Sequence, residues 1–133
     1  MGAFEAVQAI QDVVGNLVGI KSAPDYPGNG ILPIAIAHLA TGDITPGNPA
    51  GRRTELHNIA VEVHVSDDGD LTGAYTTLET LHALIVPALC LDVTFAGTLA
   101  TYSNITYSTQ PSEWYGVKTR MRLYILNGCK IIT

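Results

Sequence analysis

Two stretches in which side chains of different character alternate constrain the fold of this chain more than any other feature. The clearer one covers residues 117–125, where two series interleave: Val117, Thr119, Met121, Leu123 and Ile125, and between them Lys118, Arg120, Arg122 and Tyr124. Residues 56–65 alternate in the same way, with valines on one face and Glu62 and His64 on the other. Successive side chains of a strand point to opposite faces, so both stretches are predicted to be β-strands.

Two other regions have the spacing of helices. Apolar residues recur at steps of three and four over residues 3–18, and again from Leu71 to Leu89. Each series forms one stripe along a helix. Asp70 stands where a residue can cap the second helix. Pro87 removes a backbone donor, so the second helix is expected either to kink there or to end near Leu84.

The remaining segments fit around these elements. Residues 31–39, 93–96 and 99–107 are predicted to be strands, with a turn at Gly97. Residues 40–55 hold three glycines and two prolines and have the period of neither a helix nor a strand. We expect this segment to be an arm that projects from a hairpin, because long irregular segments within compact domains are usually functional or disordered.

The order of these elements predicts the fold class. The chain has 133 residues and a mass of 14.1 kDa, which is enough for one domain covering residues 1–133. Hairpin connections and alternating strands favour an α+β fold, with a mostly antiparallel sheet, two helices packed on one face and a long hairpin arm at about 40–55.

Composition narrows the function. Only 14% of the residues are charged and 47% are hydrophobic, which excludes a disordered chain and suggests that other subunits cover part of the surface. A net charge of −5 argues against a general nucleic-acid binder. No secretory signal is visible and the apolar runs are too short to span a bilayer, so we expect a soluble cytosolic product with no membrane partner. Cys90 and Cys129 are expected to be reduced, buried thiols.

The sequence offers little for catalysis. Glu62 and His64 share a strand face and could begin a metal site, but nothing nearby in sequence completes it, and a solvated or subunit-facing pair is the alternative. The acidic cluster at 67–70 lacks the spacing of a calcium loop, because Leu78 stands where such a loop needs glutamate. There is no nucleophile or nucleotide motif. We therefore predict no catalytic, cofactor-binding or metal-binding residues, and no enzyme.

The sharpest charged feature is cationic. Lys118, Arg120 and Arg122 are three of the seven cations and share one predicted strand face, while Arg52 and Arg53 stand at the root of the arm. The stripe could bind phosphate or an acidic partner, pair with another subunit, or block unwanted strand pairing. The two arm arginines could reach a neighbour or simply be solvated. We predict that all five contact a partner, and that Arg120→Glu weakens assembly while leaving the monomer folded.

Several segments of the sequence resemble those of a known protein family. The sequence 56–65, the helix opening at Asp70, and residues 91–98 (Leu-Asp-Val-Thr-Phe-Ala-Gly-Thr) resemble the tail terminator, or tail completion, proteins of long-tailed bacteriophages. Residues 105–107, 114–119, the closing strand and the N-terminal helix with residues 20–27 fit the same pattern. The resemblance covers most of the chain apart from 40–55. Neck and minor tail proteins share much of it.

The resemblance implies a structural virion protein of the phage tail or neck, made in the host cytoplasm. Its subunits would form a homo-oligomeric ring, usually a hexamer, that caps the completed tail tube and docks to the head connector. Duplex DNA would pass through the lumen without sequence-specific binding. The family has no catalytic residues to carry over. The alternatives are a head–tail stopper or other neck or minor tail protein, and a small metal-binding enzyme domain built around Glu62 and His64.

Overall fold

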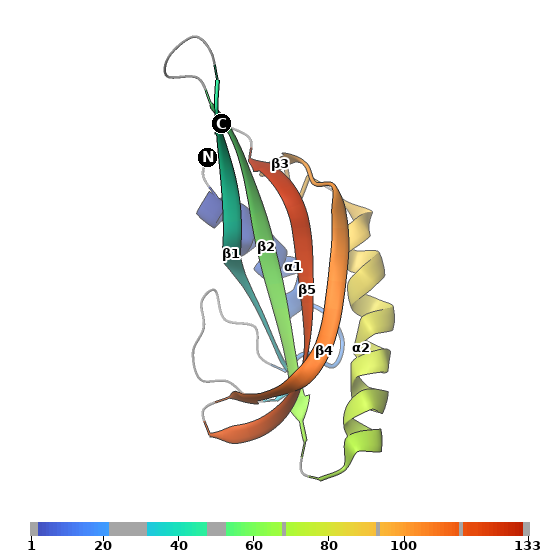
Figure 1. Ribbon diagram of the computed structural model, residues 1–133. Coiled ribbons are helices and arrows are strands. Elements are labelled where there is room, and N and C mark those ends of the chain that lie inside the picture. The colour runs from blue at the N-terminus through green and yellow to red at the C-terminus, as the bar shows by residue number, and fades with distance from the viewer. Residues whose placement is uncertain are drawn as a thin grey trace.

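The computed structural model describes residues 3–21, 32–47, 53–67, 69–92, 94–114 and 116–131. Its elements follow in the order α1 (Ala3–Gly15), β1 (Ile34–Pro46), β2 (Arg53–Ser66), α2 (Leu71–Leu91), β3 (Leu99–Thr101), β4 (Asn104–Trp114) and β5 (Val117–Ile131). The strands form one antiparallel sheet in the order β1-β2-β5, and β4 and β3 lie one after the other along the far edge of β5. Both helices pack on one face of this sheet, so the predicted α+β architecture is confirmed (Figure 1).

Strand register explains how the two faces of the sheet differ. Val61 on β2 lies between Ala37 of β1 and Tyr124 of β5, and all three side chains belong to the core beneath the helices. The next residue, Glu62, points to the opposite face. Because the period of a strand is two, the whole valine series of β2 faces the helices, as the alternation predicts.

The helix stripes complete the core. Ile10 and Val14 of α1 and Leu78 and Leu89 of α2 are essentially inaccessible to solvent. α2 continues past Pro87 to Leu91, so the alternative in which it ends near Leu84 is wrong. Pro87 stands on the exposed side, and the buried residues around it hold the last turns against the sheet.

α2 also has the length and composition of a helix that could cross a membrane, a test that core helices of soluble proteins also pass. Here one side of it is buried against the sheet, through residues at the expected helical spacing: Ala74, Leu78, Leu81, Ile85 and Leu89. Only Glu79 carries a formal charge among its residues. The helix therefore presents a weakly charged outer side to its surroundings.

The segment after α2 differs from the prediction. Residues 94–98 form a turn rather than a strand, and Phe95 and Ala96 have positive φ angles of 45° and 59°. The carboxylate of Asp92 accepts hydrogen bonds from the backbone N–H groups of Thr94 and Ala96, at 3.0 Å each. These local bonds compete with strand pairing. Val93 lies outside the described residues.

Strand structure resumes at residue 99, but again not as predicted. The expected strand 99–107 is two strands, β3 and β4, and β4 continues to Trp114. The chain crosses between them at Tyr102 and Ser103, where the Ser103 N–H bonds to the carbonyl of Asn127. The alternation in this region is weak because the outer face of β4 is polar and exposed.

The hairpin arm is present and regular. Pairing between β1 and β2 continues from Thr41 opposite Asn58 to Pro46 opposite Arg53, after a register shift between Leu39 and Thr41. The expectation that residues 40–55 lack strand structure is therefore wrong for the described part, although the projecting hairpin is confirmed (Figure 1). Both faces of the arm are exposed, so no alternation of apolar and polar residues marks it.

Candidate interaction surfaces

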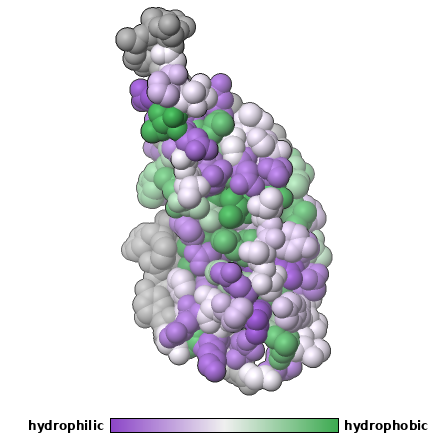
Figure 2. All heavy atoms as spheres, in the orientation of Figure 1, coloured by the Kyte–Doolittle hydropathy of each residue, from purple (hydrophilic) through white to green (hydrophobic). Residues whose placement is uncertain are grey.

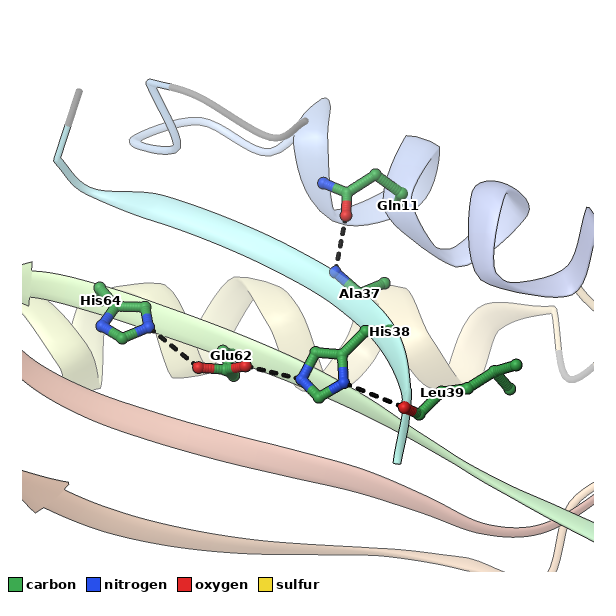
Figure 3. A network of polar contacts seen from close by, with 6 residues as sticks. All are labelled: Gln11, Ala37, His38, Leu39, Glu62 and His64. Carbon is green, nitrogen blue, oxygen red and sulfur yellow. Dashed lines mark hydrogen bonds and ion pairs between the residues drawn. The ribbon is translucent and has the colours of Figure 1, made fainter. Parts of the chain in front are cut away.

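A buried glutamine closes the outer edge of β1 within the body of the protein. Gln11 of α1 is 1% exposed, and its amide nitrogen donates to the carbonyl of Ala35 at 2.9 Å. Its amide oxygen accepts from the N–H of Ala37 at 2.6 Å (Figure 3). The carboxamide thus bonds as a neighbouring strand would. An incoming strand cannot pair here, because these backbone groups are already satisfied.

The arm has no such cover among the described residues. Ile44 is 66% exposed, and Leu56 on the other face is 36% exposed. Figure 2 shows hydrophobic surface on the coloured part of the arm, apart from the larger hydrophobic area on the body. A two-stranded ribbon is only marginally stable alone in water. The arm is therefore the part of the fold that has most to gain from a partner.

Glu62 joins two histidines on the sheet face away from the helices. Its Oε2 lies 2.6 Å from His38 Nε2, and its Oε1 lies 3.1 Å from His64 Nε2 (Figure 3). His64 is 1% exposed, bonds through Nδ1 to the Thr119 hydroxyl at 2.9 Å, and packs against the Trp114 ring. The predicted shared face of Glu62 and His64 is confirmed, and His38 joins them across the β1–β2 pair.

Hydrogen bonds shift the pKa values of His38 and Glu62 in this network. His38 Nδ1 lies 3.2 Å from the carbonyl of Leu39, so both ring nitrogens of His38 face oxygen acceptors. The bond to Glu62 raises the pKa of His38 above 6.5. Bonds from His38 and then His64 lower the pKa of Glu62 from 4.5 to about 2.

This geometry is that of an ion pair rather than a metal site. Each histidine directs Nε2 at a different oxygen of the same carboxylate, so the three groups do not converge on one point. Within the described ranges, no group of three histidine, cysteine or acidic side chains could hold a metal ion. The carboxylate instead fastens β1 to β2 immediately before the arm begins.

Two residues of the predicted cationic stripe form ion pairs with acidic residues of the same chain. The Arg120 guanidinium bonds to Asp67 at 2.9 Å and lies 5.8 Å from the centre of the Tyr75 ring. Arg122 is 4% exposed beneath α2, where it pairs with Glu79 at 2.8 Å. Both therefore face α2. Arg120→Glu would also remove the pair with Asp67 within the subunit, while its effect on assembly and the prediction that the monomer stays folded remain predictions.

The other predicted contact residues lie nearer the surface. Lys118 is exposed near the turn between β4 and β5. Arg53 is exposed on the arm and pairs with Glu55 at 3.1 Å. Arg52 lies outside the described residues. Contact of Lys118 and Arg53 with a partner stays a prediction, while Arg122 is buried in the isolated subunit.

The acidic turn is explained by local structure. The Asp70 side chain accepts from the Gly73 N–H at 2.9 Å and so caps α2, as predicted. A Cβ added at Gly73 would overlap the Asp70 carboxylate, so glycine permits this close approach. Asp67 is occupied by Arg120, and Asp68 lies outside the described residues.

A groove between α2 and β4 is the second surface of interest. It encloses about 390 Å³ and is lined by His82, Val86, Cys90, Tyr102, Asn104, Ile105, Tyr107 and Tyr124. His82 packs against the Tyr107 ring and bonds through Nδ1 to the Tyr124 hydroxyl at 2.7 Å. Burial raises the pKa of Tyr124 to about 12, so its hydroxyl stays protonated. None of the lining residues is an aspartate, glutamate, lysine or arginine. Cys90 is exposed here, so the expectation that both thiols are buried is wrong for Cys90 and confirmed for Cys129.

The contact of Gln11 with β1 and this groove were not predicted from the sequence. Gln11 had a detectable signal, because it is a polar residue within the apolar stripe of Val7, Ile10 and Val14. The sequence carries no such signal for the groove, since its lining residues come from three separate segments. The bond between His38 and Glu62 depends on the β1–β2 register, which the sequence does not specify.

Comparison with known proteins does not assign this chain to a family. Neither a scan against protein-family models nor a search of the curated proteins finds a match to this chain.

Proposed function

We propose that this chain is a structural subunit of the tail or neck of a long-tailed bacteriophage. Copies of the subunit assemble into a ring, which we expect to be a hexamer. The ring caps the completed tail tube and provides the surface to which the head connector docks. Duplex DNA passes through the lumen without sequence-specific contacts. The proposal starts from the sequence resemblance, which implies a small α+β subunit, and the observed α+β fold agrees with it. The hairpin arm lies outside the segments that carry the resemblance.

The observation that carries the proposal is the arm itself. It is an ordered two-stranded ribbon that stands out from the body and exposes an aliphatic side chain on each face. The body already has a closed core and a sealed edge at Gln11. A subunit that is complete in its body and exposed in its arm is suited to repeated assembly with copies of itself.

The charge distribution supports the same role. Arg120, Arg122 and Arg53 each have an acidic partner within the chain. The net charge is −5. A DNA-binding surface would need several unpaired cations to contact phosphates, and such contacts would retard DNA in transit. These features favour a channel through which DNA slides.

The test is assembly and capping. Purified protein at high concentration is examined by negative-stain electron microscopy and native mass spectrometry, then mixed with tail tubes of the phage that encodes it. We expect rings with a central hole, and tubes whose ends carry one extra ring and stop growing. Strictly monomeric protein that also fails to bind tube ends would contradict the proposal.

A further inference from the structure

The arm and the α2–β4 groove lie on opposite sides of the same end of the subunit. In Figure 1 the arm rises at the upper left, where β1 and β2 leave the body, while the second half of α2 and the start of β4 lie at the upper right. The width of the sheet separates them. The arm of one molecule is therefore not placed to fill its own groove.

The two surfaces match chemically. The groove is lined mostly by aliphatic and aromatic side chains, and its main polar contact, between His82 and Tyr124, is already made. It offers apolar cover without an unsatisfied charge. Ile44, on the arm, is an aliphatic side chain with no comparable cover. Burying such a side chain on association is favourable, because it removes apolar surface from water.

Charges on the arm do not oppose this burial. Ile44 pairs with Glu55 and so shares its face, and Glu55 is already bonded to Arg53. Asp43 pairs with Leu56 and lies on the other face of the ribbon. The Ile44 face thus brings a compensated ion pair toward a groove without charges, which avoids the desolvation of a lone charge.

We infer that the arm of one copy docks into the α2–β4 groove of the next copy, with Ile44 as the inserted side chain. This inference rests on the proposed ring, because rotation about a ring axis places the left side of one subunit beside the right side of its neighbour. The contact joins two different patches, so it propagates from subunit to subunit. It assigns the groove to a second copy of this chain rather than to a small ligand.

The native Cys90 provides a direct test, because it is exposed and lines the groove. In the variant Ile44→Cys, mild oxidation should join the introduced thiol to Cys90 of a neighbouring copy. Disulfides form only when the two Cα atoms come within about 7 Å. Non-reducing gels should show a ladder of covalent oligomers, because every copy is linked on both sides. Native mass spectrometry is recorded on the same samples.

Two controls isolate the contact. Ile44→Cys combined with Cys90→Ser should give no ladder, since Cys129 is buried. Ser108→Cys places a thiol on an exposed position of β4 away from the groove and should not form the ladder either. In the wild-type background, Ile44→Asp should lower the apparent association constant by at least about tenfold while circular dichroism stays unchanged, because a charge would have to enter the groove.

The outcomes separate the two proposals. Rings without cross-links, and unaffected by Ile44→Asp, overturn the docking contact and leave the ring function in place. A ladder with no binding to tail tubes supports the docking contact and contradicts the capping function. Cross-linked dimers only, or monomers only, overturn the docking contact because each excludes a head-to-tail series.

Discussion

The two halves of the β1–β2 hairpin are built differently although they are one continuous ribbon. In the body half, Ala35 and Ala37 are fully buried and their outward backbone groups bond to Gln11. In the arm half, beyond the register shift at Leu39, side chains on both faces are exposed. The His38–Glu62 pair stands at the boundary.

The body half holds groups that stabilise the subunit, whereas the arm half holds groups that are available to a partner. The body half satisfies its polar groups and apolar surface within the chain. The arm half leaves both its outer edge and Ile44 open among the described residues, so the exposed Ile44 side chain adds little to the stability of the isolated subunit. Changes in the body should therefore alter unfolding, and changes in the arm should alter association.

The largest effect on unfolding is expected from Gln11→Leu. It leaves the Ala35 carbonyl and the Ala37 N–H buried without a partner, and each lost partner costs about 1–3 kcal/mol. We expect the free energy of unfolding to fall by about 3 kcal/mol in urea titrations. Gln8→Leu on the same helix is the matched control and should change it by less than about 0.5 kcal/mol. Equal effects at both positions would remove the distinction between a sealed and an open edge.

The second-largest effect on unfolding is expected from Arg120→Glu. It places two carboxylates together at Asp67, where both side chains are largely shielded from solvent, and should destabilise the monomer by about 2 kcal/mol. The reversed pair, Asp67→Arg with Arg120→Glu, should recover at least half of that loss in a double-mutant cycle. An unchanged free energy of unfolding of the monomer would instead support the prediction that Arg120 acts in contact with a partner.

A pH effect smaller than the effects of these two substitutions is expected at the boundary between the two halves of the hairpin. The folded pKa of His38 is raised, so its contribution is complete below pH 6.5 and is lost as pH rises through the folded pKa. The pKa of Glu62 is lowered, so its contribution is present above 4.5 and is lost as pH falls toward about 2.

Urea titrations from pH 5 to 9 would measure the histidine part of this effect. We expect wild-type stability to decline above neutral pH relative to His38→Gln, which cannot lose a proton there. His57→Gln serves as the control, because His57 lies on β2 without this carboxylate contact. Parallel curves for wild type and His38→Gln would show that the ion pair does not fasten the root of the arm.

Ile44→Ser should have the smallest effect on unfolding, below about 0.5 kcal/mol, because the side chain is exposed in the subunit. Its effect should appear in association, which analytical ultracentrifugation over a concentration series would measure. Thr45→Ser, one residue along the same strand, is the matched control. A loss of more than 1 kcal/mol in monomer stability would place Ile44 in the body rather than on a partner surface.

The sequence predicted the elements whose periodicity arises from burial on one side. The valine series of β2, the stripes of both helices and the cap at Asp70 were all predicted because each follows a local rule. Strand pairing in the arm was missed because a ribbon exposed on both faces has no alternation. The turn at 94–98 was missed because side-chain bonds from Asp92, rather than periodicity, set its backbone.

Contacts between residues far apart in the sequence explain why the candidate surfaces were predicted only in part. The expected shared face of Glu62 and His64 needed only the period of a strand. Their link to His38 needed the β1–β2 register, and the use of Arg122 needed the position of α2 over the sheet. Such placements depend on tertiary packing, which one sequence does not specify.

Amide hydrogen exchange followed over a concentration series tests most directly whether the arm depends on partners while the body does not. In dilute protein, we expect the amides of Ile44 and its neighbours on β1 and β2 to exchange rapidly, and the Ala37 amide bonded to Gln11 to be strongly protected. On assembly, the arm amides should become protected and Ala37 should not change. Arm amides that are equally protected at every concentration would contradict this division of the hairpin.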